Sequence, residues 1–226
     1  LLDSYHKWLS YQMKWREERN RSMEKLEFPF IYRKGQKEMV AGIYHAISRK
    51  EQIFIQAPTG VGKTMSAVFP AVRSIGEGKA ETLFYLTART ITRTVAQDAF
   101  EILRKNGLLF KTVTITAKEK LCFCEKPECN PETCPYAKGH YDRINDAVYE
   151  LWTNEQSFDR ETILRQAEKC QVCPFEMSLD LSVWMDAVIC DYNYVFDPNV
   201  YLKRFFGENI SGKYLFLIDE AHNLVE

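Results

Sequence analysis

The chain has 226 residues, of which 46% are hydrophobic and 27% are charged, and its formal net charge at pH 7 is −1. This composition is typical of a soluble globular protein and shows no global basic character, so any nucleic-acid contact has to come from a local patch. No apolar run approaches the roughly 18 residues that span a bilayer, and no signal-peptide pattern opens the chain. Seven cysteines, an odd number, then favour a metal or thiol role over a disulfide framework. We expect a cytoplasmic protein that has no membrane partner.

The two ends of the sequence resemble cut points. The chain starts at Leu1 within a segment of helical character and stops at Glu226, shortly after an expected strand. Residues 1–27 are expected to form an upstream helix and linker. The helix is weakly amphipathic, and Pro29 prevents it from continuing. We therefore expect a fragment of a longer protein.

Strand and helix patterns alternate through the first half of the chain, and two further strand patterns follow near its C-terminus. The expected strands are 51–57, 81–87, 111–116, 186–192 and 213–220, and the expected helices of this part are 34–47, 63–75 and 91–105. Such alternation predicts an α/β fold with a parallel sheet covered on both faces. The alternation stops for about seventy residues after 116. This region contains six cysteines, and two helices are expected in it. A helical insertion in an α/β domain is the simplest interpretation.

A phosphate-binding loop follows the first expected strand. The stretch QAPTGVGKT, residues 56–64, contains A-x-x-x-x-G-K-T, with alanine in place of the usual first glycine. Glycines let the backbone N–H groups turn towards phosphate oxygens, and the N-terminus of the next helix favours an anion. Lys63 is expected to reach the β- and γ-phosphates, and Thr64 to coordinate Mg²⁺. The candidate ATP-binding residues of this loop are Ala57, Pro58, Thr59, Gly60, Val61, Gly62, Lys63 and Thr64.

An acidic pair ends the last expected strand. YLFLIDEAH, residues 214–222, carries Asp219 and Glu220 directly after an apolar run. Asp219 is expected to hold Mg²⁺ through water, and Glu220 to orient and deprotonate the attacking water, which makes Lys63, Asp219 and Glu220 the candidate catalytic residues. His222 is expected to couple the nucleotide state to a nucleic-acid face. Together with the phosphate-binding loop, these residues predict an NTPase.

The order of these motifs resembles that of superfamily 2 helicases, in which the segment matching YLTARTITRTVAQD, residues 85–98, contacts DNA. The resemblance implies DNA-binding roles for Thr87, Arg89 and Arg93, and adenine recognition by Arg33 and Gln36. From the residues alone, Thr87 could equally cap a helix and Gln36 could equally be a solvated residue at a helix start.

Six of the seven cysteines lie in the region where the alternation stops, between the segment 85–98 and the expected strand 186–192. Their spacing is C-x-C-x4-C-x4-C, then thirty-five residues, then C-x2-C. Structural zinc sites usually combine two close cysteine pairs, whereas the four ligands of an iron–sulfur cubane approach separate iron corners and tolerate unequal spacing. Spacing alone therefore leaves zinc and iron–sulfur open.

The stretches KLC, CPYA and CPFE, followed by DAVICDYNYVFDP and DEAH, resemble the XPD/DinG-type iron–sulfur DNA helicases, and more closely their bacterial branch. The resemblance covers roughly residues 28–226. It implies a RecA-like motor domain formed by 28–117 and 183–226, incomplete at its C-terminus, and an iron–sulfur insertion at 118–182. The implied [4Fe–4S] ligands are Cys122, Cys129, Cys134 and Cys173, which leaves Cys124 and Cys170 spare, while Cys190 is expected to be a buried thiol.

The resemblance also implies an activity: ATP- and Mg²⁺-dependent unwinding of DNA, 5′ to 3′, at single strands and forks in repair or replication. An arch domain and a second motor domain are expected beyond Glu226, and no oligomer is expected. Two other interpretations remain open, namely a zinc-stabilised nucleic-acid-binding module and a P-loop NTPase that does not unwind.

Overall fold

The structure is a computed structural model that describes residues 2–58, 60–88, 90–126 and 128–224. By its internal contacts the chain divides into a first unit, Leu1–Phe110 with Asp191–Glu226, and a second unit, Lys111–Cys190. The domain limits implied by the sequence stay a prediction. Among the described residues, no helix combines the length and apolar character that crossing a membrane requires.

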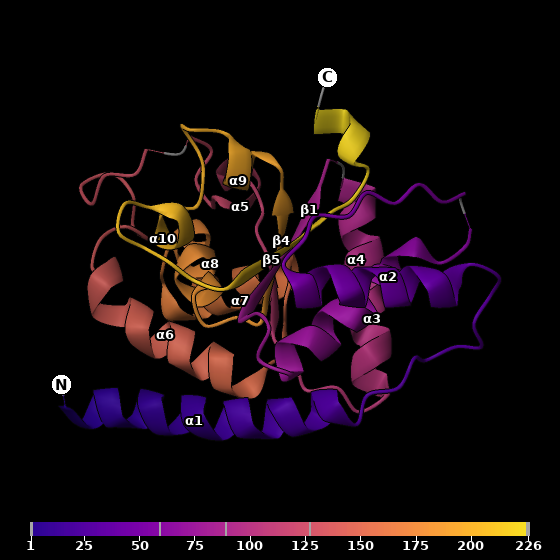
Figure 1. Ribbon diagram of the computed structural model, residues 1–226. Coiled ribbons are helices and arrows are strands. Elements are labelled where there is room, and N and C mark those ends of the chain that lie inside the picture. Colours follow the sequence, from indigo (N-terminus) through magenta and orange to yellow (C-terminus); the bar gives the residue numbers. More distant parts are fainter. Residues whose placement is uncertain (1, 59, 89, 127, 225–226) are drawn as a thin grey trace. The chain divides into compact units, whose positions relative to one another are not determined.

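The first unit contains helices around a parallel strand pair (Figure 1). Its elements are α1 (Leu2–Glu24), α2 (Gln36–Arg49), α3 (Lys63–Gly76), β1 (Thr82–Thr87), α4 (Thr90–Lys105), α9 (Asn193–Phe196), α10 (Lys203–Phe206), β5 (Tyr214–Ile218) and the 3₁₀ turn η1 (Ala221–Leu224). Strand β1 pairs with β5 in parallel, from Thr82 opposite Tyr214 to Leu86 opposite Ile218. Helix α3 packs against α1, α2 and α4 and also against both strands.

Aromatic rings fill the core beside this strand pair. Phe84 of β1 is fully buried and stacks on Phe216 of β5, with 5.4 Å between the ring centroids. Phe205 and Tyr214 meet the ring of Phe84 edge-on, at 5.0 Å and 5.5 Å. Such offset and edge-on contacts are the favoured geometries of aromatic pairs, so they fix β1 and β5 against the segment that carries α10.

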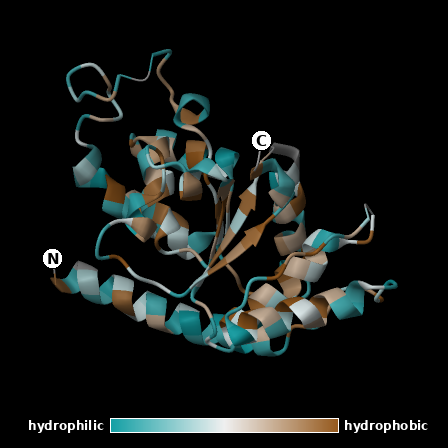
Figure 2. Cartoon of the chain, turned by 45° about the horizontal axis from the view of Figure 1, so that its top comes forward, coloured by the Kyte–Doolittle hydropathy of each residue, from teal (hydrophilic) through white to brown (hydrophobic). Residues whose placement is uncertain are grey.

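The leading helix α1 packs through its C-terminal half. Trp15 and Met23 are buried, while Leu2 and Tyr5 of the expected apolar face are 75% and 61% exposed. A Cβ atom at Gly76, the last residue of α3, would lie 2.6 Å from the Cβ of Met23, so the close approach of α1 to α3 requires glycine there. In Figure 2, α1 alternates between teal and brown from the N label onwards, in keeping with its mixed sequence.

The second unit combines three parallel strands with four helices (Figure 1). Its elements are β2 (Thr112–Thr114), α5 (Lys118–Leu121), α6 (His140–Asn154), β3 (Ser157–Phe158), α7 (Arg160–Cys170), α8 (Pro174–Ser182) and β4 (Ala187–Asp191), the last of which ends at the first residue of the other unit. Strand β2 pairs with β3 and β4, with Val113 opposite Phe158 on one side and Val188 on the other. The prediction of an α/β fold with parallel strands is confirmed.

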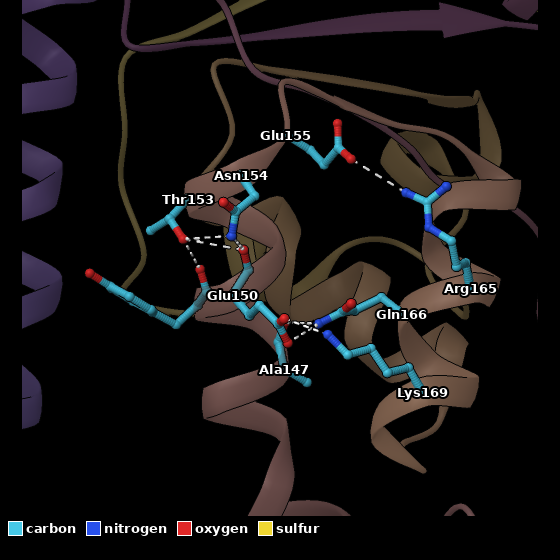
Figure 3. A network of polar contacts seen from close by, with 9 residues as sticks. Ala147, Glu150, Thr153, Asn154, Glu155, Arg165, Gln166 and Lys169 are labelled. Carbon is cyan, nitrogen blue, oxygen red and sulfur yellow. Dashed lines mark hydrogen bonds and ion pairs between the residues drawn. The ribbon is translucent and has the colours of Figure 1, made fainter.

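A polar network ties α6 to α7 (Figure 3). Gln166 donates through Nε2 to the Ala147 carbonyl oxygen at 3.1 Å and to the Glu150 carboxylate at 3.0 Å. Lys169 binds the other carboxylate oxygen of Glu150, and this hydrogen bond is the main reason why the pKa of Glu150 is lowered. One carboxylate therefore joins two successive turns of α7 to α6.

Residues 51–57, expected as a strand, do not form one. The segment forms neither helix nor strand, and Phe54 is 87% exposed. Ile53 contacts α2 at Gly42, where an added Cβ would lie 3.5 Å from its Cδ1. An apolar run predicts a buried strand only where a neighbouring strand and a covering layer are both supplied.

Lys111 supplies the second unit with a buried cation, from which we derive a stability prediction. Its side chain is 1% exposed, and Nζ donates to the carbonyl oxygens of Trp152 and Glu155 at the C-terminal end of α6. An ammonium group at this end satisfies otherwise unpaired carbonyls and opposes the helix dipole. Lys111→Met removes both hydrogen bonds from this buried site, so we expect the free energy of unfolding to fall by about 2 to 3 kcal/mol in urea titration.

The matched control is Lys169→Met, which removes a lysine that also contacts α6 but lies on the surface, with its side chain 58% exposed. We expect a much smaller change there, because exposed ion pairs contribute little. Equal unfolding midpoints for Lys111→Met and the unmodified protein would contradict the role given to Lys111.

Candidate nucleotide site and cysteine cavity

The phosphate-binding loop is held in place by two side chains from the start of α2. Gly60 and Gly62 adopt left-handed backbone conformations, with φ of 80° and 75°, and α3 begins at the next residue. Gln36 donates through Nε2 to the Val61 carbonyl oxygen at 2.6 Å, and Arg33 donates to that of Gly60 at 2.6 Å. A Cβ at Gly62 would lie 2.6 Å from Gln36 Nε2. Both upstream candidates therefore meet the loop, which they support through its backbone; adenine recognition by them stays a prediction.

The lysine of the loop and the glutamate of the acidic pair face each other. Lys63 Nζ lies 3.8 Å from Glu220 Oε1, and it donates to the Ala57 carbonyl oxygen at 3.2 Å. The two side chains are 32% and 42% exposed, so both remain open to a ligand. Residues more than 150 positions apart in sequence thus meet at one point, as the nucleotide hypothesis requires. Thr59, another residue of this candidate set, lies outside the described residues.

Asp219 occupies a more buried position beside Tyr85. Burial raises the pKa of the Asp219 carboxyl above its ordinary value, and Glu220 adds to this, while a hydrogen bond from Tyr85 and the charge of Lys63 oppose it. Burial, with the charge of Asp219, also raises the pKa of Tyr85, whose hydroxyl interacts with both Thr64 and Asp219. The two expected Mg²⁺ ligands thus share one tyrosine. Sequence reasoning missed Tyr85, although a tyrosine in an otherwise apolar strand needs a polar partner.

The acidic pair sits in a turn with an unusual backbone. Glu220 has φ of 52°, in the left-handed region, and η1 begins directly after it. The Asp219 N–H donates to the Leu86 carbonyl oxygen at 3.0 Å, which extends the β1–β5 pairing by one bond. His222 lies beside Glu220, with Nδ1 3.4 Å from Oε2, and its side chain is 67% exposed. Its coupling role stays a prediction.

Two of the three candidate DNA contacts are buried in the described part of the chain. Thr87 is fully buried. Arg93 is 8% exposed and forms an ion pair with Asp191, and Arg89 lies outside the described residues. A buried ion pair is costly to break, so Arg93 supports the first unit in this conformation. Contact of these residues with DNA stays a prediction.

Five cysteines line one cavity of about 270 Å³ in the second unit. The thiols are those of Cys122, Cys124, Cys129, Cys134 and Cys173. Cys122 follows α5 directly and Cys173 precedes α8, so helix ends hold the first and last of them. Cys170 does not line the cavity, and Cys190 is fully buried in β4 as expected.

Contacts around the cavity fix part of its wall. The Cys173 N–H donates to His140 Nδ1 at 3.2 Å, and the rings of Phe123 and Tyr136 approach to 4.6 Å. Cys124 and Cys134 bring their sulfur atoms within 3.9 Å of each other. Partial desolvation and the neighbouring Cys134 raise the pKa of Cys124 to about 11, and burial raises that of Cys173, so a metal would have to displace protons from these thiols.

The cavity supplies thiols as its donor set, and thiolates bind both zinc and iron. Among the described residues, no three or more His, Cys, Asp and Glu side chains converge so that they could hold a metal ion. Five thiols around a shared cavity instead suit ligands that approach separate corners of a cluster. The thiol chemistry by itself remains compatible with zinc or iron.

Known helicases match both halves of the chain. The description "DEAD/DEAH box helicase" matches residues 33–130, and "DEAD_2" matches residues 104–226. The regulator of telomere elongation helicase 1 homolog of Caenorhabditis briggsae is 23% identical over 247 residues, which are 90% of this chain and 24% of that protein. The Fanconi anemia group J protein homolog of Gallus gallus is 31% identical over 94 residues, which are 41% of this chain and 7% of that protein. The chain thus spans about a quarter of the first relative.

Solved structures give the same fold. An XPD helicase superposes with a TM-score of 0.53 at 18% identity, over 85% of this chain and 33% of that one. A truncated XPD superposes with a TM-score of 0.51 at 19% identity, over 84% of this chain and 52% of that one. The resemblance drawn from the motifs is confirmed. Because the matched region 104–226 is more than half of its length, the chain belongs to the DEAD_2 family.

Proposed function

We propose that this chain is the ATP-binding part of an ATP-dependent DNA helicase. The observation that carries the proposal is the meeting of Lys63 with Glu220 at 3.8 Å, beside Asp219, in a chain of the DEAD_2 family. An NTPase needs a cation for the phosphates and carboxylates for Mg²⁺ and water at one place. The relatives named as helicases support DNA unwinding as the use of this site.

The nucleotide chemistry follows from the positions of these side chains. Lys63 binds the β- and γ-phosphates, and its ion pair with Glu220 opens when ATP enters. Thr64 and Asp219 would hold Mg²⁺, which would neutralise charge on the phosphates, and Glu220 would orient and deprotonate the attacking water. Burial of Asp219 favours a bound cation, because a partly desolvated carboxylate gains most from a positive partner.

DNA is the proposed partner, as single strands and forks. Thr87, Arg89 and Arg93 contact its backbone in this proposal, with His222 coupling them to the nucleotide site. The burial of Thr87 and Arg93 means that such contact requires a rearrangement of the segment after β1. Unwinding from 5′ to 3′ in repair or replication, completed by arginines of a second motor domain, rests on the resemblance alone.

For the cysteine cavity we propose a [4Fe–4S] cluster held by Cys122, Cys129, Cys134 and Cys173. All four line the same cavity, which supports the assignment. When bound, such a cluster would cross-link the loop that precedes α6 to the N-terminus of α8. A rigid edge beside incoming DNA is the role we give to this part of the chain.

Replacing Lys63 tests the nucleotide site. In the full-length protein we expect Lys63→Ala to lower DNA-stimulated ATP hydrolysis by about 10² to 10³-fold, because the main cation for the transferred phosphate is lost. Glu220→Gln should lower hydrolysis to a small residual rate while leaving ATP binding intact. Phosphate release measured against ATP concentration separates the two effects.

Lys14→Ala is the matched control, because the pair that Lys14 forms with Glu18 on α1 is exposed. Wild-type ATPase in Lys63→Ala would refute the proposed site. Hydrolysis that single-stranded DNA does not stimulate, with no strand separation, would instead identify a P-loop NTPase that does not unwind.

Metal analysis tests the cysteine cavity. We expect the purified protein to contain iron and acid-labile sulfide with broad visible absorbance, and Cys134→Ser to lose all three, because a cubane needs each of its four thiolates. Cys170→Ser, outside the cavity, should keep them.

The fifth thiol of the cavity supplies a sharper comparison. If Cys124→Ser lost its iron while Cys129→Ser kept it, the ligand set would have to include Cys124 in place of Cys129. A colourless protein with stoichiometric zinc would favour the zinc-stabilised nucleic-acid-binding module.

A further inference from the structure

Tyr192 lies directly after β4, in the stretch DAVICDYNYVFDP, for which neither motif nor proposed chemistry supplies a role. Its side chain is 9% exposed. The hydroxyl group donates to the backbone carbonyl oxygens of Asp219 and of Glu220, the latter at 3.0 Å. A tyrosine from the first unit thus reaches the backbone of both acidic residues of the nucleotide site.

The contacted turn is strained. Lys50 and Gln171 share the positive φ of Glu220, but both are the residues that end helices, where a left-handed conformation is common. Glu220 instead follows a strand and precedes a 3₁₀ turn. A non-glycine residue keeps such a conformation only when its surroundings impose it.

Three hydrogen-bond donors hold Glu220 in this conformation, because all three contact its carbonyl oxygen. The Glu220 carbonyl oxygen accepts from Tyr192 and from both the backbone N–H and the side-chain Nδ2 of Asn223, each of the latter two at 2.9 Å. Asn223 belongs to the turn itself, whereas Tyr192 comes from a different segment. Of these three donors, the Tyr192 hydroxyl group is the one that ties the Glu220 carbonyl oxygen to a different segment of the first unit.

The position of Tyr192 is itself fixed. Its neighbour Asp191 forms an ion pair with Arg93 of α4, whose side chain is nearly buried. The backbone of Tyr192 is also held, because its carbonyl oxygen accepts hydrogen bonds from the N–H groups of Val195 and Phe196, both at 2.9 Å. The hydroxyl group consequently reaches the acidic pair from a rigid support.

We propose that Tyr192 is a positioning residue for hydrolysis: its hydroxyl group holds the left-handed turn that aims the Glu220 carboxylate at the γ-phosphate and the attacking water. The proposal rests on the proposed function, because it needs Glu220 to act on water. It assigns no contact between Tyr192 and the nucleotide. A misaligned base slows the chemical step without weakening the binding of ATP.

The test compares two tyrosines in the full-length protein. Tyr192→Phe removes only the hydroxyl group; Tyr214→Phe is the matched control, since Tyr214 also donates to a backbone carbonyl oxygen, that of Phe205 at 3.3 Å, but at the opposite end of β5. We expect kcat of Tyr192→Phe to fall by about tenfold, the effect of one such hydrogen bond, with KM and the affinity for a fluorescent ATP analogue unchanged. Tyr214→Phe should keep the wild-type kcat.

A double-mutant cycle makes the test specific. In the Glu220→Gln background, Tyr192→Phe should add no further loss to the residual single-turnover rate, because the group that it positions is already gone. An additive loss, a wild-type kcat in Tyr192→Phe, or a reduced analogue affinity in that variant would each overturn the proposal. Full ATPase in Glu220→Gln would instead defeat the proposed function, so the two failures are distinguishable.

Discussion

The parallel pairing of β1 with β5 is the constraint on which the nucleotide site depends. It joins residues about 130 positions apart in sequence and continues past the strand ends, where the Asp219 N–H binds the Leu86 carbonyl oxygen. Since parallel strands end at the same edge, this one register sets the acidic pair beside Tyr85 and Thr87. A shift by one residue would turn Phe84 out of its aromatic cluster and move Asp219 away from Lys63. The packing of the aromatic cluster and the geometry of the nucleotide site therefore require the same strand register.

Features encoded by local sequence could be predicted. The loop QAPTGVGKT predicted a backbone turn at its glycines and a helix beginning at Lys63. In the structure Gly60 and Gly62 have positive φ, and α3 does begin at Lys63. The segment 51–57 shows the limit of that reasoning, since its apolar residues predict a strand but a ladder needs a partner from elsewhere in the chain. Strand β3 was missed for the converse reason. It consists of Ser157 and Phe158 alone, too short for a periodic pattern.

Roles that depend on distant contacts could not be predicted. Arg93 lies within the segment 85–98 as a basic residue on a helix, and nothing in the neighbouring sequence indicates its ion pair with Asp191. Tyr192 likewise looks like one more aromatic residue in an apolar stretch until its hydroxyl group is found against Glu220. In both cases the polar group is satisfied by a partner that the topology brings close, so burial decides the role that residue type leaves open.

The cysteines combine both situations. Their order along the chain indicated a metal site, but it could not separate Cys124 from Cys170, because each lies two or three residues from a proposed ligand. Their positions in the structure distinguish Cys124 from Cys170. Cys170 ends α7 outside the cavity, whereas Cys124 faces into it with its sulfur 3.9 Å from that of Cys134. The chain therefore brings five thiols to one cavity, one more than the proposed [4Fe–4S] cluster would need, so position in the cavity alone does not choose its ligands.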